Sequence, residues 1–437
     1  MKTAVLRSVS HDLDRSGAAG TRAAHALTQM TPRVWILIAG LAGLAGWAPP
    51  AAADPLARTT LDESIGLAPR DGINVPGPAA GSSFTVQALG STGLTAGRDE
   101  GRRSLAFFAQ LTDGQLTDEM SPARIEFLRP FGAFLGAWRP HEALAPQTVD
   151  QAVRNINANA VSRIEGAAGR RARLQFAIVT GDLADNGQHN EIRWGVRVLD
   201  GGRVDPFSGA RVAPETSRCP GAPRRVVRRL NAAVAARRYT GVQDASDWPG
   251  RPAAAYGGFY DPDAPTGAFG LLPRYPGLLD RAQRPFRARG LSVPWYSARG
   301  NHDALAQGFF SARWGGRIAT GCRKVMPLGS LPAGERGSDW EIMRRLLAGR
   351  RFEWVPPDRE RRFASPQAFK RLHGRADRGH GYDFVARRQL RRSRGAASYY
   401  AWSPQPGLRF IALDTAAEGG GYLGNIDHPQ YLSLIHI

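Results

Sequence analysis

The sequence predicts an α/β fold whose functional site lies at the carboxyl ends of its strands. Two observations support this prediction. Four short apolar runs each lead into a polar loop that carries Asp, Asn or His, and stretches of helical pattern separate these runs. The 437 residues are 42% hydrophobic and 22% charged, which excludes a wholly disordered chain and suffices for two or three average domains or one large domain with insertions.

An apolar stretch near the N-terminus predicts a secretory signal peptide over residues 1–53. The stretch covers residues 34–48, follows Arg22 and Arg33, and leads into small alanines at 51–53 that a signal peptidase can accept. No Arg-Arg pair precedes it, which favours Sec-type over twin-arginine export. We therefore expect a secreted or cell-surface protein, with an uncleaved membrane anchor as the alternative.

The remaining elements follow in chain order. Residues 54–103, rich in Gly, Ala, Thr and Ser, predict an extended lead-in. Bounded apolar runs then predict strands at 104–111, 173–180, 291–297 and 408–413. Helical patterns open at Ser121-Pro122, cover 147–166, and form a basic helix over 226–236.

Two long insertions, at about 200–290 and 304–405, are rich in Arg and Pro. Connections of this length are usually functional lids or subdomains. They carry much of the net charge of +20, in which 58 Lys and Arg outnumber 38 Asp and Glu. This charge predicts non-specific attraction to polyanions. We infer no specific nucleic-acid partner, because neither a stacking platform nor a nucleic-acid motif accompanies the arginines.

The chain has two cysteines, Cys219 and Cys322, and we expect them to form a disulfide. An even number of cysteines is typical of disulfide pairing in an exported protein. The pair lacks the CxxC spacing of a zinc site. Two separately buried thiols are the alternative.

Three of the strand ends carry side chains suited to metal binding. They are Asp113, then Gly181-Asp182 with Asp185 and Asn186, then Gly300-Asn301-His302-Asp303. Carboxylate and amide oxygens with an imidazole can hold a pair of divalent or trivalent ions, with one carboxylate bridging the two. The order and placement of these groups predict a dinuclear metal site.

These motifs resemble those of the calcineurin-like metallophosphoesterases. That family's signature is D-x-H, G-D-x-x-D/N, G-N-H-D/E and later histidines that include G-H-x-H. The two middle motifs match at residues 181–186 and 300–303, and the resemblance covers about residues 105–430. Four further segments resemble a secreted, actinobacterial-type subfamily: 111–124, 241–244, 259–263 and 274–286.

The resemblance implies a four-layer α/β/β/α sandwich of two mixed sheets, formed in part by residues 104–437 and interrupted by the two insertions. It implies a hydrolase of phosphate monoesters or diesters that uses two ions of Fe, Mn, Zn or Co to activate a water molecule. By the same resemblance, Asp113 binds the first ion, Asp182 bridges both and Asn301 binds the second.

The resemblance also assigns roles to the neighbouring groups. His302 would stabilise the transition state or protonate the leaving alkoxide, and Asp303 would orient its imidazole. Asp185 and Asn186 would orient the metal-binding residues without binding the ions themselves.

The sequence departs from the family pattern in two places. Gln115 occupies the position of the first motif's metal-binding histidine, so it is a doubtful ligand, and Asp118 is a possible auxiliary. The later histidine motif is absent, and we expect His373 and His380 to lie on the surface of the second insertion. We therefore expect an incomplete domain with poor catalytic activity.

Two alternatives from other functional classes stay open. One is a non-catalytic secreted binding module on the same scaffold, which Gln115 favours. The other is an arginine-rich polyanion binder.

Overall fold

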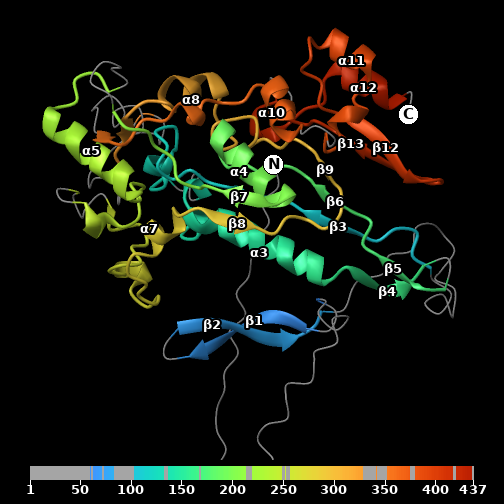
Figure 1. Ribbon diagram of the computed structural model, residues 1–437, viewed down its shortest axis with the longest axis horizontal. Coiled ribbons are helices and arrows are strands. Elements are labelled where there is room, and N and C mark those ends of the chain that lie inside the picture. Colours follow the sequence, from blue (N-terminus) through green and yellow to red (C-terminus); the bar gives the residue numbers. More distant parts are fainter. Residues whose placement is uncertain are drawn as a thin grey trace, which may run out of the picture. The chain divides into compact units, whose positions relative to one another are not determined.

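A three-stranded parallel sheet organises the computed structural model (Figure 1). Its strands are β3 (Phe108–Leu111), β6 (Phe176–Val179) and β9 (Trp295–Ser297), in the order β3-β6-β9. Each lies within one of the predicted apolar runs but is shorter than that run. Because the three strands are parallel, the loops that follow them leave from one edge of the sheet.

The structure describes a large part of the chain: residues 60, 63–70, 73–82, 103–131, 136–166, 169–212, 219–248, 251, 256–327, 341, 352–374, 379–416 and 420–435. All of them belong to one compact unit, Pro55–Ile437. The predicted signal peptide and possible anchor lie outside the described residues. Within the lead-in, β1 (Glu63–Arg70) and β2 (Ile73–Ala80) form an antiparallel pair.

Two amphipathic helices, α3 (Ala145–Ala158) and α4 (His189–Asp200), share a hydrophobic core with the central sheet. Val153 of α3 and Ile192 of α4 are fully buried in this core together with Ala177 of β6. The helix expected at 147–166 begins earlier, with a proline in its first turn, and ends earlier. The chain then forms an antiparallel pair, β4 (Val161–Glu165) with β5 (Arg171–Arg173).

An antiparallel hairpin, β12 (Tyr400–Gln405) and β13 (Leu408–Ala412), packs its aromatic side chains on the central sheet. The ring centroid of Phe410 lies 5.3 Å from those of Phe108 and Phe176, and Trp402 stacks on Tyr296 at 4.6 Å. The strand expected at 408–413 is therefore present, and it pairs with β12. The chain has a mixed α/β architecture with several small sheets.

The two insertions contain short elements joined by loops. The first runs between β7 (Gly202–Val204) and β8 (Phe286–Ala288), which pair antiparallel. Its other elements are α5 (Arg224–Ala236), η5 (Ala245–Asp247), η6 (Gly267–Phe269) and α7 (Leu278–Ala282). The second contains α8 (Ala312–Ile318), β10 (Arg323–Val325), β11 (Phe352–Trp354), η7 (Arg359–Arg361), α10 (Pro366–His373), η8 (Tyr382–Phe384) and α11 (Arg387–Arg392). After β13 come η9 (Gly421–Leu423) and α12 (His428–Ile435).

The disulfide and the basic helix agree with the sequence predictions. Cys219 and Cys322 are bonded, with Cα atoms 5.5 Å apart, and the bond ties the first insertion to the second. Helix α5 buries Leu230 and Ala233, while four of its arginines are exposed, as on an ordinary solvated face: Arg224, Arg225, Arg228 and Arg229. None of the described helices is long and apolar enough to cross a bilayer.

Two predictions about local structure are wrong. The segment from Ser121 contains turns and a 3-10 helix, η2 (Glu126–Leu128), where we expected an α-helix. Backbone N–H groups of this segment donate to side-chain oxygens instead of to helical carbonyl groups. The N–H of Ile125 donates to Gln307 Oε1, and the N–H of Ala123 donates to Ser121 Oγ.

The second wrong prediction concerns histidines of the second insertion. His373 is fully buried, and His380 is buried and stacks on Trp295 at 3.6 Å between ring centroids. Neither lies on the surface as expected. Their imidazoles fill the core behind β9, a role that the surrounding basic sequence does not reveal.

Candidate functional site

Asp113, Asp182 and Asn301 come together at the carboxyl edge of the central sheet. Asp113 follows β3, Asp182 follows β6, and Asn301 lies in the loop after β9. All three line one pocket of about 520 Å³. The segment that follows β13, with Thr415 and Asn425, lines the same pocket. The motifs that resemble the metallophosphoesterase signature therefore share one site, which we call the motif site.

Two glycines allow the loops after β6 and β9 to touch. A Cβ atom on Gly300 would lie 2.0 Å from Asp182 Oδ1, and one on Gly181, at φ 111°, would lie 2.9 Å from the Cα of Gly300. The backbone N–H of His302 donates to the same Asp182 oxygen at 2.9 Å. This close approach excludes any larger residue at position 300 and fixes the direction of the Asp182 carboxylate.

Asp113 is held beside Asp182 by an extension of the strand pairing. The backbone N–H of Asp113 donates to Gly181 O at 3.2 Å, and that of Gln115 donates to Asp182 O at 2.9 Å. The hydroxyl of Thr112 donates to Asp113 Oδ2 at 2.6 Å. Asp113 adopts a left-handed φ of 54°, which Asp tolerates better than most residues.

Gln115 does not face the pocket that holds Asp113, Asp182 and Asn301. Its amide oxygen accepts a hydrogen bond from Arg139 Nη1, and its amide nitrogen is 3.4 Å from Asp113 Oδ1. It lines a neighbouring cavity with Arg139 and His141, and Asp113 lines both cavities. The doubt about Gln115 as a metal ligand is thus strengthened by the partner that its oxygen already has.

Asn301 is oriented through its nitrogen. Its Nδ2 donates to Gly308 O at 3.1 Å, and none of the described residues donates a hydrogen bond to its Oδ1. An amide held in this way presents a neutral oxygen with free lone pairs to the pocket.

Asp185 orients the imidazole of His302. Nδ1 of His302 lies 2.8 Å from Asp185 O and 3.4 Å from Asp185 Oδ1. Burial disfavours the charged imidazole, but the hydrogen bond to Asp185 and the charges of Asp185 and Asp182 outweigh it and raise the pKa of His302 to about 9. These neighbouring carboxylates therefore favour the protonated imidazole of His302.

Asp303 has a different role from the one expected. Its carboxylate accepts the backbone N–H groups of Ala184 and Gly300 at 2.9 and 3.0 Å, so it clamps the two loops together. Burial raises the pKa of Asp303 to about 7. The expectation that Asp303 orients the His302 ring is wrong, because Asp185 occupies that position.

A buried arginine that sequence reasoning missed stands behind Asp185. Arg124 is fully buried and forms ion pairs with Asp185, with Glu126 at 2.7 Å and with Glu142 at 2.6 Å. Burial opposes ionisation of Asp185, but Arg124, His302 and Arg139 hold its pKa well below the usual range. A lone arginine in a polar segment carries no sequence signal for such a role.

Asn186 and Asp118 also point away from the pocket. Asn186 Oδ1 accepts the backbone N–H of Gln307 at 2.8 Å. Both Asp118 oxygens are occupied, one by Ser208 Oγ at 2.6 Å and the other by Arg361 Nε at 2.9 Å. Asn186 therefore holds the backbone of Gln307, and Asp118 has no oxygen directed to the pocket.

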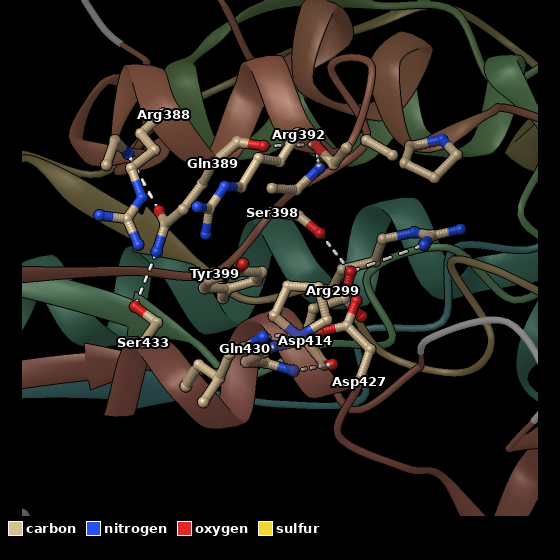
Figure 2. Close-up of a pocket in the computed structure, with 17 residues that line it drawn as sticks. Arg299, Arg388, Gln389, Arg392, Ser398, Tyr399, Asp414, Asp427, Gln430 and Ser433 are labelled. Carbon is tan, nitrogen blue, oxygen red and sulfur yellow. Dashed lines mark hydrogen bonds and ion pairs between the residues drawn. The ribbon is translucent and has the colours of Figure 1, made fainter. Parts of the chain in front are cut away.

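A second pocket, of about 620 Å³, adjoins the motif site through Arg299, which lines both. Figure 2 shows Arg299 directed toward Asp414, beside Ser398. Arg299 Nη1 lies 3.7 Å from Asp414 Oδ2, and its buried Nε has no hydrogen-bond partner among the described residues. A cation with an unused donor thus borders the motif site.

Sequence reasoning also missed a group of three carboxylates in the first insertion. One oxygen from each of Asp244, Asp261 and Asp263 lies within 4.8 Å of the other two. We call this group the insertion cluster. The sequence shows two of these carboxylates close together, in Asp261-Pro262-Asp263. No pattern in the sequence predicts that Asp244 lies beside them.

Comparisons with protein-family models, with curated proteins and with solved structures found no match for this chain. Functional inference therefore rests on the geometry of the motif site and on the motifs that build it.

Proposed function

We propose that this protein is a metal-dependent hydrolase of phosphate esters, either monoesters or diesters. One observation carries the proposal: Asp113, Asp182 and Asn301, which belong to separate motifs, line one pocket at the carboxyl edge of a parallel sheet. This is the location of ligand sites in open α/β sheets.

The donor set fits a pair of metal ions. Asp113 and Asp182 provide carboxylate oxygens, and Asn301 provides an amide oxygen that accepts no hydrogen bond from the described residues. Burial and the charge of Asp113 raise the pKa of Asp182, although His302 opposes this, so a cation in the pocket would stabilise the ionised form. When bound, two ions of Fe, Mn, Zn or Co would polarise phosphoryl oxygens and lower the pKa of a water molecule.

The protein's own residues position the substrate and hold a proton. His302 donates through Nδ1 to Asp185 O, which directs Nε2 away from Asp185, and the charged ring can give a proton to a leaving alkoxide. Arg299 lines the pocket and brings the positive charge of its guanidinium close to a bound phosphoryl group. Asp303 holds the loops of Asp182 and Asn301 together, because its carboxylate accepts hydrogen bonds from the backbone N–H groups of Ala184 and Gly300.

The layering and the disulfide support two related proposals. Helices α3 and α4 and the β12–β13 hairpin both pack on the central sheet, as in the four-layer sandwich of the metallophosphoesterases. The disulfide fits an oxidising compartment, as expected after Sec-type export.

One observation favours the non-catalytic alternative. Arg139 holds the oxygen of Gln115, so the first motif supplies one ligand, Asp113, where the family has two. A binding module would retain substrate affinity without turnover.

The test uses the 437-residue protein loaded in turn with Mn²⁺, Zn²⁺, Co²⁺ and Fe²⁺. Metal binding is measured by equilibrium dialysis, and hydrolysis by release of p-nitrophenol from bis(p-nitrophenyl) phosphate. We expect binding of two ions and slow turnover. Asp182→Asn should lower turnover by about 100-fold or more, since even supporting residues cost 10–100-fold, and should also weaken metal binding.

Asp383→Asn, which changes an exposed carboxylate, is the matched control and should alter neither quantity. Metal binding without turnover for any of the four ions would favour the binding module. Absence of metal binding at the motif site would overturn the proposal.

A further inference from the structure

The insertion cluster lies in loops of the first insertion. Asp244 directly precedes η5, and Asp261 and Asp263 follow Tyr260. None of the three lines the pocket of the motif site. An inference about the cluster is therefore independent of the proposed hydrolase.

Asp244 is a buried carboxylate with an unused oxygen. Asp244 is 2% exposed, and no described residue donates a hydrogen bond to its Oδ1. One of its oxygens lies within 4.8 Å of oxygens of both Asp261 and Asp263, so the side chain points into the cluster. A buried charge without a partner is costly, and such groups are usually paired or bound to a metal.

Hydrogen bonds hold Asp261 and Asp263 in place and use their acceptor sites to different extents. Asp261 Oδ2 accepts from Ser246 N and Oγ at 3.1 and 2.7 Å, and its Oδ1 accepts from Asp263 N at 2.9 Å and Ala264 N at 3.2 Å. Asp263 Oδ1 accepts from Gly277 N at 2.7 Å. A carboxylate has about four lone-pair sites, so Asp263 keeps acceptor capacity for an ion, whereas Asp261 would bind the ion in place of one of its four hydrogen bonds.

The surroundings add negative charge. After burial itself, the groups that act most strongly on Asp244 are four carboxylates: Asp263, Asp261, Asp247 and Asp280. Arg274 Nε donates to the backbone oxygen of Asp263 at 2.6 Å, and Arg238 Nε lies 4.0 Å from a carboxylate oxygen of Asp280. The charge of the cluster is thus uncompensated by close ion pairs among the described residues.

We infer that Asp244, Asp261 and Asp263 bind a Ca²⁺ ion that fastens the loops of the first insertion. The donors are all carboxylate oxygens, with no sulfur or imidazole, which suits hard cations and disfavours Zn²⁺ or Cu²⁺. Ca²⁺ accepts irregular geometries and added backbone or water oxygens, whereas Mg²⁺ requires near-octahedral ones. The disulfide is typical of proteins in oxidising surroundings, where modules with weak calcium sites are common.

The test measures thermal unfolding of the 437-residue protein after EDTA treatment, with and without 5 mM CaCl₂. Calcium should raise the wild-type Tm by about 2–4 °C, because a ligand that binds only the folded state stabilises it. Asp244→Asn should abolish this rise. Without calcium this variant should be at least as stable as wild type, since it removes a buried charge and Asn tolerates the φ of 48° at this position.

Two controls make the result specific. Asp247→Asn removes a neighbouring carboxylate outside the cluster and should keep the calcium-dependent rise. Asp182→Asn should also keep it, which separates this site from the motif site. Terbium luminescence, excited through the protein's aromatic residues, should appear in the Asp182→Asn protein, fall on addition of Ca²⁺, and be lost when Asp244→Asn is added to that protein.

An unchanged wild-type Tm in calcium, or an equal rise in Asp244→Asn, would overturn the inference. So would a larger rise in MgCl₂ than in CaCl₂ at the same concentration.

Discussion

Asp185 behind the motif site and Asp244 in the insertion cluster are buried carboxylates in opposite surroundings. Asp185 contacts Arg124, Arg139 and His302, so the protein itself supplies positive charge to it. In the insertion, the strongest charged neighbours of Asp244 are other carboxylates. The difference teaches that the chain can itself neutralise a carboxylate that supports a site at the edge of a sheet, whereas carboxylates brought together by loops leave negative charge for a ligand to offset.

The largest effect should follow loss of the positive charge behind the motif site. Arg124→Met leaves Glu126, Glu142 and Asp185 buried without their common partner. Removing one member of a buried ion pair costs about 3–5 kcal/mol. Urea unfolding should show this loss. The stability of the variant should also increase with added Mn²⁺, because a bound cation would offset the negative charge that Arg124 no longer neutralises.

The exposed pair of Arg193 and Glu360, 2.7 Å apart, provides the control for this experiment. Arg193→Gln should change the free energy of unfolding by about 1 kcal/mol or less. Equal losses from both substitutions would show that the buried network does not preform the site.

The next effect should come from the bond that fastens the insertion. Replacing Cys219 and Cys322 together by Ser removes a link between residues 103 apart in sequence. We expect a loss of about 2–4 kcal/mol, chiefly from the greater freedom of the unfolded chain. Thermal unfolding with and without calcium checks it, and the calcium-dependent rise in Tm should persist, since none of the three carboxylates is altered.

If the double substitution also removed the rise in Tm with calcium, the insertion cluster would not stabilise the insertion independently of the disulfide. Reduction of wild type by dithiothreitol should give a similar loss of stability and serves as the control for effects of the serines.

The smallest effect should appear as a pH dependence of the core behind the motif site. Burial lowers the pKa of His373 to about 3, and its Nδ1 lies 2.9 Å from Phe369 O. In the unfolded chain the pKa is about 6.5. The neutral ring therefore contributes its full stability above about pH 6.5, and this is lost as the pH falls, by up to about 1.4 kcal/mol per unit.

Unfolding by urea between pH 7.5 and 5 measures this slope. His373→Gln should be less stable at pH 7.5 but should show a smaller loss on acidification. A slope equal to that of wild type would mean that other groups carry the acid sensitivity.

The sequence allowed good prediction of features that depend on neighbouring residues. The apolar runs predicted the three strands of the central sheet. The cysteine pair and helix α5 were confirmed. Each of these follows from composition or spacing within a short segment.

Features that depend on distant partners were not predicted. The segment after Ser121 forms no α-helix, in part because its backbone N–H groups bond to side chains such as Gln307. Asp303 clamps two loops instead of orienting His302, a distinction that only the relative placement of β6 and β9 decides. The loops of the first insertion bring Asp244 close to Asp261 and Asp263. Loops have no periodic sequence pattern, so this proximity could not be predicted from the sequence.

The pairing of β7 with β8 has a consequence for the order in which the chain folds. Strands β6 and β9 are neighbours in the central sheet, yet the whole first insertion lies between them in sequence. Closing a loop costs about 0.6 kcal/mol more for each doubling of its length. Once β7 and β8 have paired, the effective loop between β6 and β9 is much shorter. Substitutions that weaken β7–β8 should therefore slow the refolding rate more than they speed unfolding.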